Sequence, residues 1–145
     1  MPLPTVELIL QAVHSRLQTI SGAVVERNRD TDVQVPNTLV IREDQQTVVS
    51  ENSGYTQYTL DVFIEGYAKK TATKSVGQAI NELYASVVEK IAVDVSFSGL
   101  AIDTREISLD RDLSYESGAG SIGAFSLLLQ ISFMTPAGDP YNAGP

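Results

Sequence analysis

The sequence predicts an α+β domain: an antiparallel β-sheet with two α-helices packed on one face. Residues 5–20 and 73–92 repeat apolar side chains at every third or fourth position, which is typical of amphipathic helices. Residues 55–67 and 121–134 alternate apolar and polar side chains, which is typical of strands with one buried face. The elements follow in the order α, three or four β, α, two β, and hairpins can join the strands, which favours an antiparallel sheet.

Composition limits the size and the chemistry of the protein. The chain has 145 residues, of which 43% are hydrophobic, so we expect one domain with one core. It has no cysteine and a single histidine, which excludes a disulfide framework, a thiolate nucleophile and a multi-histidine metal site. The net charge of −8 argues against binding to nucleic-acid phosphates. No apolar run approaches the roughly 20 residues of a membrane span, and no signal-peptide pattern is present, so we expect a soluble, unprocessed protein without a membrane partner.

The first helix has signals at both ends. Pro4 and Thr5 suit its start, and the Glu7 carboxylate complements the helix dipole there. Gly22 can take the left-handed conformation that ends a helix. His14 lies beside the apolar stripe, and because the sequence identifies no partner to orient it, we interpret it as a surface or rim histidine rather than a general base.

Between this helix and the long strand at 55–67, the pattern predicts three short strands, over residues 23–26, 38–42 and 47–51. The polar residues 43–46 would connect the last two as a hairpin, and residues 52–54 would turn the chain again. The long strand then places Phe63 and Tyr67 on its less buried face. Together with other exposed aromatic residues, these two would mark a contact surface.

The second helix is expected from about Thr73 to Ala92. Ser75 and Gln78 have the spacing of a capping box, although Thr71 or Thr73 could cap the helix equally well. After it, residues 102–109 alternate weakly as a strand.

The segment 110–120 is polar and rich in glycine, and we expect it to connect the strand at 102–109 to the final strand. Leu83 on the second helix and Leu129 on the final strand are predicted to be buried together. Pro136 and Pro140 cannot donate to a sheet ladder, so pairing should end near Thr135. A single domain over residues 1–135 would then be followed by a flexible tail, 136–145.

Two sequence patterns could indicate a chemical site: a glycine-rich match and a stretch of acidic residues. Gly118–Gly123 matches G-x-G-x-x-G, but a polar loop precedes it and a strand pattern follows it, whereas a dinucleotide site needs a strand before and a helix after. We favour a hairpin loop and keep a nucleotide-binding or small-ligand module as the alternative. The acidic residues of segment 103–116 fit a solvated loop, and no serine lies in G-x-S-x-G. We therefore predict no catalytic, cofactor-binding or metal-binding residues, and no enzyme.

Several segments, taken in order with the two helices, resemble one family. These are residues 35–41 (Val-Pro-Asn-Thr-Leu-Val-Ile), 58–65 (Tyr-Thr-Leu-Asp-Val-Phe-Ile-Glu) and 131–140, which end in Thr-Pro-Ala-Gly-Asp-Pro. The last is the most specific. Nearly the whole chain is similar to the tail-terminator and minor tail-completion proteins of long-tailed bacteriophages.

This resemblance implies a structural virion subunit. Such subunits have an α+β fold, assemble into a ring that is commonly a hexamer, cap the finished tail tube and offer a surface to the head connector. The implied partners are the tail tube protein and a connector or neck protein, while DNA passes through the ring without specific binding. The implied location is the tail or neck of the virion, after a stay in the host cytoplasm. Another head–tail joining component of related fold is the alternative within this class.

Closure into a ring needs one surface patch to fit a different patch on the next copy. We expect sheet edges and apolar loop residues to lie between subunits, and the segment 110–120 to become ordered against a neighbour. The predicted contact residues are Phe63, Tyr67, Leu113, Tyr115, Pro136, Asp139 and Tyr141.

Overall fold

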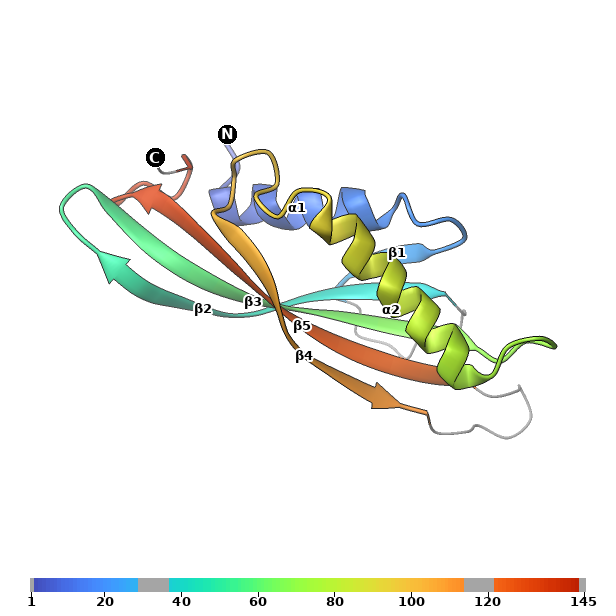
Figure 1. Cartoon of the computed structure of the whole chain (residues 1–145). Coiled ribbons are helices and arrows are strands. Elements are labelled where there is room, and N and C mark those ends of the chain that lie inside the picture. Colours follow the sequence, from blue (N-terminus) through green and yellow to red (C-terminus); the bar gives the residue numbers. More distant parts are fainter. Residues whose placement is uncertain (1, 29–36, 114–121, 144–145) are drawn as a thin grey trace.

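A five-stranded sheet and two helices make up the protein (Figure 1), which confirms the predicted α+β class. The computed structural model describes residues 2–28, 37–113 and 122–143. In chain order the elements are α1 (Thr5–Leu17), β1 (Val24–Arg27), β2 (Thr38–Glu51), β3 (Tyr55–Lys69), α2 (Val76–Ala92), β4 (Asp103–Asp112) and β5 (Ile122–Pro136).

The strands lie in the order β1-β2-β3-β5-β4, and the sheet is mixed. Three of the four strand pairs are antiparallel, but β1 runs parallel to β2, so the prediction of a wholly antiparallel sheet is wrong at this edge. Val24 pairs with Thr38, so the chain returns to the start of β1 before β2 begins. The long connection between the two strands makes that return possible, whereas a short hairpin turn would have reversed the strand.

β2 is one long strand, and the predicted hairpin over residues 38–51 is wrong. Its polar residues remain in the ladder with β3: Glu43 lies opposite Val62 and Gln46 opposite Leu60, with a register irregularity between them. The irregularity absorbs one extra residue, as a β-bulge does. These polar residues do not interrupt the strand because the half of β2 after Arg42 is exposed to solvent along its whole length.

β3 and β5 form the centre of the sheet, and their pairing is unbroken from Tyr55–Pro136 to Lys69–Ile122. In β5 every second residue is buried, and in β3 every second residue except the half-buried Tyr58. The apolar ones among them form one core cluster with the apolar stripes of α1 and α2. Figure 1 draws both helices on the same side of the sheet. Leu83 and Leu129 both belong to the cluster, which confirms their predicted burial.

α2 ends at Ala92 as predicted and begins at Val76, a few residues after the expected start near Thr73. Ser75 caps α2, and its hydroxyl accepts a hydrogen bond from the Gln78 N–H at 3.2 Å, which confirms the capping position. α1 ends at Leu17, earlier than expected, and a turn follows in which Gly22 has φ of 77°.

Arg16 on α1 fixes the connection between α2 and β4. Its guanidinium donates to the carbonyls of Ile91 and Asp94 at the end of α2 and lies 4.4 Å from the centroid of the Phe97 ring. The Asp94 carboxylate in turn accepts hydrogen bonds from the hydroxyl and N–H of Ser96 and from a second backbone N–H. These bonds, led by the one from the Ser96 hydroxyl, lower the pKa of Asp94 to about 2. The connection is therefore held by polar contacts around one buried ring.

Part of the predicted flexible tail is attached to the domain. Pairing ends at Pro136, close to the predicted stop at Thr135. The N–H of Thr5, the first residue of α1, then donates to the Pro140 carbonyl at 2.8 Å, and the Ala137 N–H donates to the Gly54 carbonyl at 3.1 Å. Residues 137–140 thus satisfy one of the free donors that begin every helix.

Candidate subunit interface

Phe63 and Tyr67 lie on the sheet face turned away from the core cluster, as predicted, and both are half-buried. The Glu65 carboxylate between them accepts a hydrogen bond from the Arg42 guanidinium at 2.8 Å and one from the Tyr67 hydroxyl at 3.4 Å. Tyr67 also lines a shallow hollow of about 180 Å³ with Asp110 and other residues of β4 and β5. This face therefore mixes aromatic area with satisfied polar groups.

Leu113 lies on the opposite face, against the start of α2. A Cβ added at Gly77 would lie 3.7 Å from one Leu113 methyl group, and a Cβ added at Gly123 would lie 3.3 Å from the other. The Leu113 side chain is 37% exposed, so it packs on the domain while keeping some open area. Tyr115, its predicted companion, lies outside the described residues, as does most of the segment 110–120.

Pro136, Asp139 and Tyr141 lie at the far end of the sheet. Pro136 pairs with Tyr55, which is twelve residues from Tyr67 along β3, or about 40 Å at the usual rise of a strand. The Asp139 carboxylate accepts hydrogen bonds from the Tyr141 N–H at 3.0 Å and from the Asn142 side chain at 2.6 Å, which lower the pKa of Asp139. The predicted contact residues therefore occupy three separate places rather than one patch.

The two outer edges of the sheet are the features that sequence reasoning did not assign to residues. Within residues 2–28, 37–113 and 122–143, β1 covers the outer edge of β2 only as far as Ile41, and no strand covers the outer edge of β4. Val48 and Val49 on the β2 edge are 52% and 50% exposed. The two adjacent valines can be read from the sequence. The predicted hairpin, however, paired residues 47–51 with residues 38–42, so it did not place these valines at an open edge.

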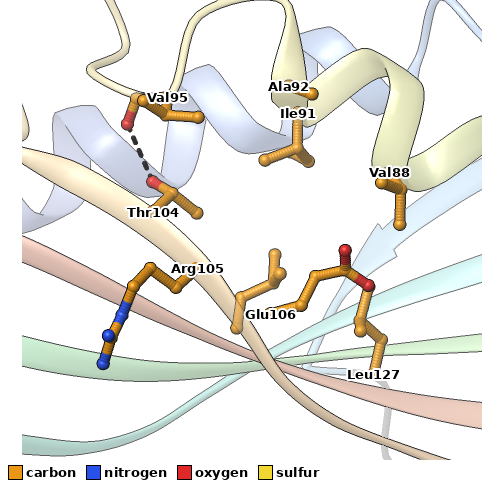
Figure 2. Close-up of a pocket in the computed structure, with 9 residues that line it drawn as sticks. Val88, Ile91, Ala92, Val95, Thr104, Arg105, Glu106 and Leu127 are labelled. Carbon is orange, nitrogen blue, oxygen red and sulfur yellow. Dashed lines mark hydrogen bonds between the residues drawn. The ribbon is translucent and has the colours of Figure 1, made fainter.

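A small apolar hollow opens beside the β4 edge, beneath the end of α2 (Figure 2). Its volume is about 90 Å³. The Thr104 hydroxyl at its rim donates to the Val95 carbonyl at 2.8 Å, and the Glu106 carboxylate accepts from the Tyr84 hydroxyl, which raises the pKa of Tyr84. The polar groups at the rim thus already have partners. The lining residues are Val88, Ile91, Ala92, Val95, Thr104, Arg105, Glu106, Leu127 and Leu129.

Gly123, the last glycine of the G-x-G-x-x-G match, has a packing role. It is buried in β5, and a Cβ added there would come within 2.4 Å of Val76 on α2. The chain continues from Gly123 as a strand, so the helix that a dinucleotide fingerprint requires is not at this place. Residues 118–121 of the match lie outside the described part of the chain.

The described residues hold no group of three or more His, Asp or Glu side chains that could bind a metal ion. His14 is half-buried and lines a surface hollow with Gln11, Ser15 and Arg27. Among the helices that the structure describes, none is both long and apolar enough to cross a membrane.

No protein-family model matches the chain, and no curated protein matches it in sequence. The resemblance to tail-terminator proteins therefore rests on the sequence segments alone and remains an expectation.

Proposed function

We propose that this protein is a structural virion subunit that repeats as a ring, caps the tail tube of a long-tailed bacteriophage and joins it to the head connector. The observation that carries the proposal is the pair of open sheet edges. Residues 43–51 of β2 and 103–111 of β4 lie on opposite sides of one sheet, and no described strand covers either outer edge.

Open edges of this kind need an explanation, because unpaired backbone groups invite another strand unless they are covered, charged or paired. A ring made of identical copies needs two different surfaces that fit each other. Two dissimilar edges on opposite sides of one sheet meet that requirement. A subunit whose work is to repeat has a use for both of them.

Further support comes from the sequence. The segment from Thr135 to Pro140 and the order of the elements resemble the tail-terminator family, whose members have no catalytic residues to carry over. The net charge of −8 suits a ring through which DNA passes without adhering. In this proposal, the half-buried face with Phe63 and Tyr67 and the end of the sheet near Pro136 would meet the tube and connector proteins.

The first test is the mass of the purified chain in solution at rising concentration, together with negative-stain images. We expect a closed oligomer whose mass is a fixed multiple of the single chain, seen as rings. The second test is cryo-electron microscopy of the native particle that contains the chain, where we expect a ring between tail tube and connector. A single-chain mass at every concentration, or single copies in the particle, would contradict the proposal.

A further inference from the structure

We infer that the two open edges join directly: residues 43–51 of β2 in one copy add as a strand to β4 of the next copy, and Val48 enters the hollow beneath α2. The inference rests on the proposed function, since it assumes that identical copies repeat in a ring. It names the joint, the partner segment and the side chain that anchors it.

Strand direction favours this joint. The pairs β2–β3, β3–β5 and β5–β4 are each antiparallel, so β2 and β4 of one copy point in opposite directions. Rotation about a ring axis keeps the direction of every strand along that axis. β4 of one copy and β2 of the next therefore meet antiparallel, which is the slightly more stable way to pair strands.

The levels of the two edges overlap in part: residues 43–47 of β2 lie level with residues 103–106 of β4, and Val48 lies just beyond them. Val48 lies opposite Tyr58, which lies opposite Phe133, whereas Thr104 lies opposite Ile131. Phe133 and Ile131 are two positions apart on β5, so Val48 and Thr104 differ in level by about 7 Å. Because rotation about the axis does not shift a copy along it, Val48 of one copy arrives close to the rim of the hollow in the next.

Val48 also points to the correct face. Its partner Tyr58 stacks on the core residue Phe133 with ring centroids 5.1 Å apart, which places Val48 on the side of the sheet that carries the core. Rotation keeps this side turned the same way in every copy. The side chain therefore continues into the layer between sheet and helix of the neighbour, where the hollow opens.

The hollow suits an aliphatic side chain. Its volume of about 90 Å³ is smaller than the cavity of roughly 150 Å³ that can hold benzene. Val88, Ile91 and Leu127 make it apolar, and its rim groups have partners of their own. In strand addition, backbone hydrogen bonds supply affinity and such side-chain pockets supply specificity.

Cysteine cross-linking tests the joint cleanly, because the natural chain has no cysteine. The test chain carries Val48→Cys with Ala92→Cys, two exposed positions, the second of which lines the hollow. The control chain carries Val48→Cys with Val93→Cys; Val93 is 77% exposed and does not line the hollow. Ala92 lies at the hollow with residues of β4 and β5, and at least two strand spacings of about 4.8 Å separate β2 from β5, so the bond cannot form within one chain, where it would need Cα atoms within about 7 Å.

Under mild oxidation we expect the test chain to form a ladder of covalent oligomers on a denaturing gel, whereas each single-cysteine chain stops at dimers and the control pair forms no ladder. Unfolding midpoints equal to that of the natural chain show that the variants are folded. A folded test chain that forms the oligomer by mass but gives no ladder would overturn the joint and leave the proposed ring intact. A test chain that stays a single chain in both measurements would overturn the joint and the ring together.

Discussion

The two central strands and the two long outer strands of the sheet obey different rules. β3 and β5 pair without interruption over their full length, and each alternates buried with half-buried residues except at Tyr58 and the exposed Lys69 of β3. β2 and β4 both contain register irregularities. Residues 43–51 of β2 are exposed, and so are most residues of β4. The centre of the sheet is therefore packed into the core, whereas its edges are exposed, and in the proposed ring these edges form the contacts. Changes at the centre should affect folding, and changes at the edges should affect assembly.

The largest expected difference is between a core leucine and an edge valine. Leu129→Ala removes a side chain that is 2% exposed and should lower the free energy of unfolding by about 2–5 kcal/mol, the usual cost of such a cavity. Val48→Ala, at a position 52% exposed in the single chain, should change the free energy of unfolding of the unassembled chain by about 0.5 kcal/mol or less. Urea denaturation measures both. Equal effects would mean that centre and edge do not differ in this way.

A smaller effect is expected from two glycines. A Cβ at Gly66 would lie 2.0 Å from the buried ring of Phe125, so Gly66→Ala should destabilise the centre by about 1–3 kcal/mol through overpacking. Gly77→Ala, in the first turn of α2, meets nothing closer than 3.7 Å and should be neutral or stabilising by up to about 1 kcal/mol, because alanine favours a helix. Thermal unfolding of both variants checks this, and a stable Gly66→Ala protein would contradict the close packing.

Acid should weaken the connection between α2 and β4. The pKa of Asp94 is about 2 in the folded chain, below the ordinary value of 3.8. Its carboxylate therefore stabilises the fold above about pH 4, and this contribution is lost as the pH falls towards 2. The stability of Asp94→Asn should fall less over this range than that of the natural chain. Asp44→Asn on the exposed β2 edge is the control, and if its pH profile flattens equally, the Asp94 contacts are not responsible.

The smallest expected effect concerns salt. Residues 43–51 of β2 carry three carboxylates and no cation, and residues 103–111 of β4 carry three carboxylates against two arginines, so both edges have a net negative charge and repel each other as they approach. Screening shortens from about 30 Å at 0.01 M salt to about 8 Å at 0.15 M. Sedimentation at fixed protein concentration should therefore show more oligomer at the higher salt. Dissociation by salt would indicate a contact held by opposite charges.

The sequence was sufficient for the centre of the fold. Alternation identified β3 and β5, and the spacing of apolar residues identified both helices, because each signal is local and reflects burial on one face. The sequence offered Ser75 as a cap of α2 but could not choose it over Thr71 or Thr73. The hairpin prediction failed at residues 43–46, because a solvent-exposed strand tolerates the same polar residues as a turn. The parallel pairing of β1 with β2 was not predicted either. It depends on where the chain returns after β1, and no local sequence pattern determines that.

The candidate site was predicted less well for the same reason. The sequence placed Phe63 and Tyr67 on the less buried face of β3, but it could not separate them from Leu113, which packs on the opposite face. The hollow beneath α2 combines residues of α2, β4 and β5 that are far apart in the chain. Such a site depends on strand order, which alternation alone does not determine.

Assembly after a single edge substitution decides whether the edges join the copies. Val48→Asp would bring an unpaired carboxylate into an apolar hollow, whereas Val93→Asp changes an exposed residue outside it. We predict that the mass in solution shows the natural chain and Val93→Asp as the same closed oligomer and Val48→Asp as a single chain, while a cooperative unfolding transition in all three shows that each is folded. A Val48→Asp protein that forms the same oligomer as the natural chain would contradict assembly through the β2 edge.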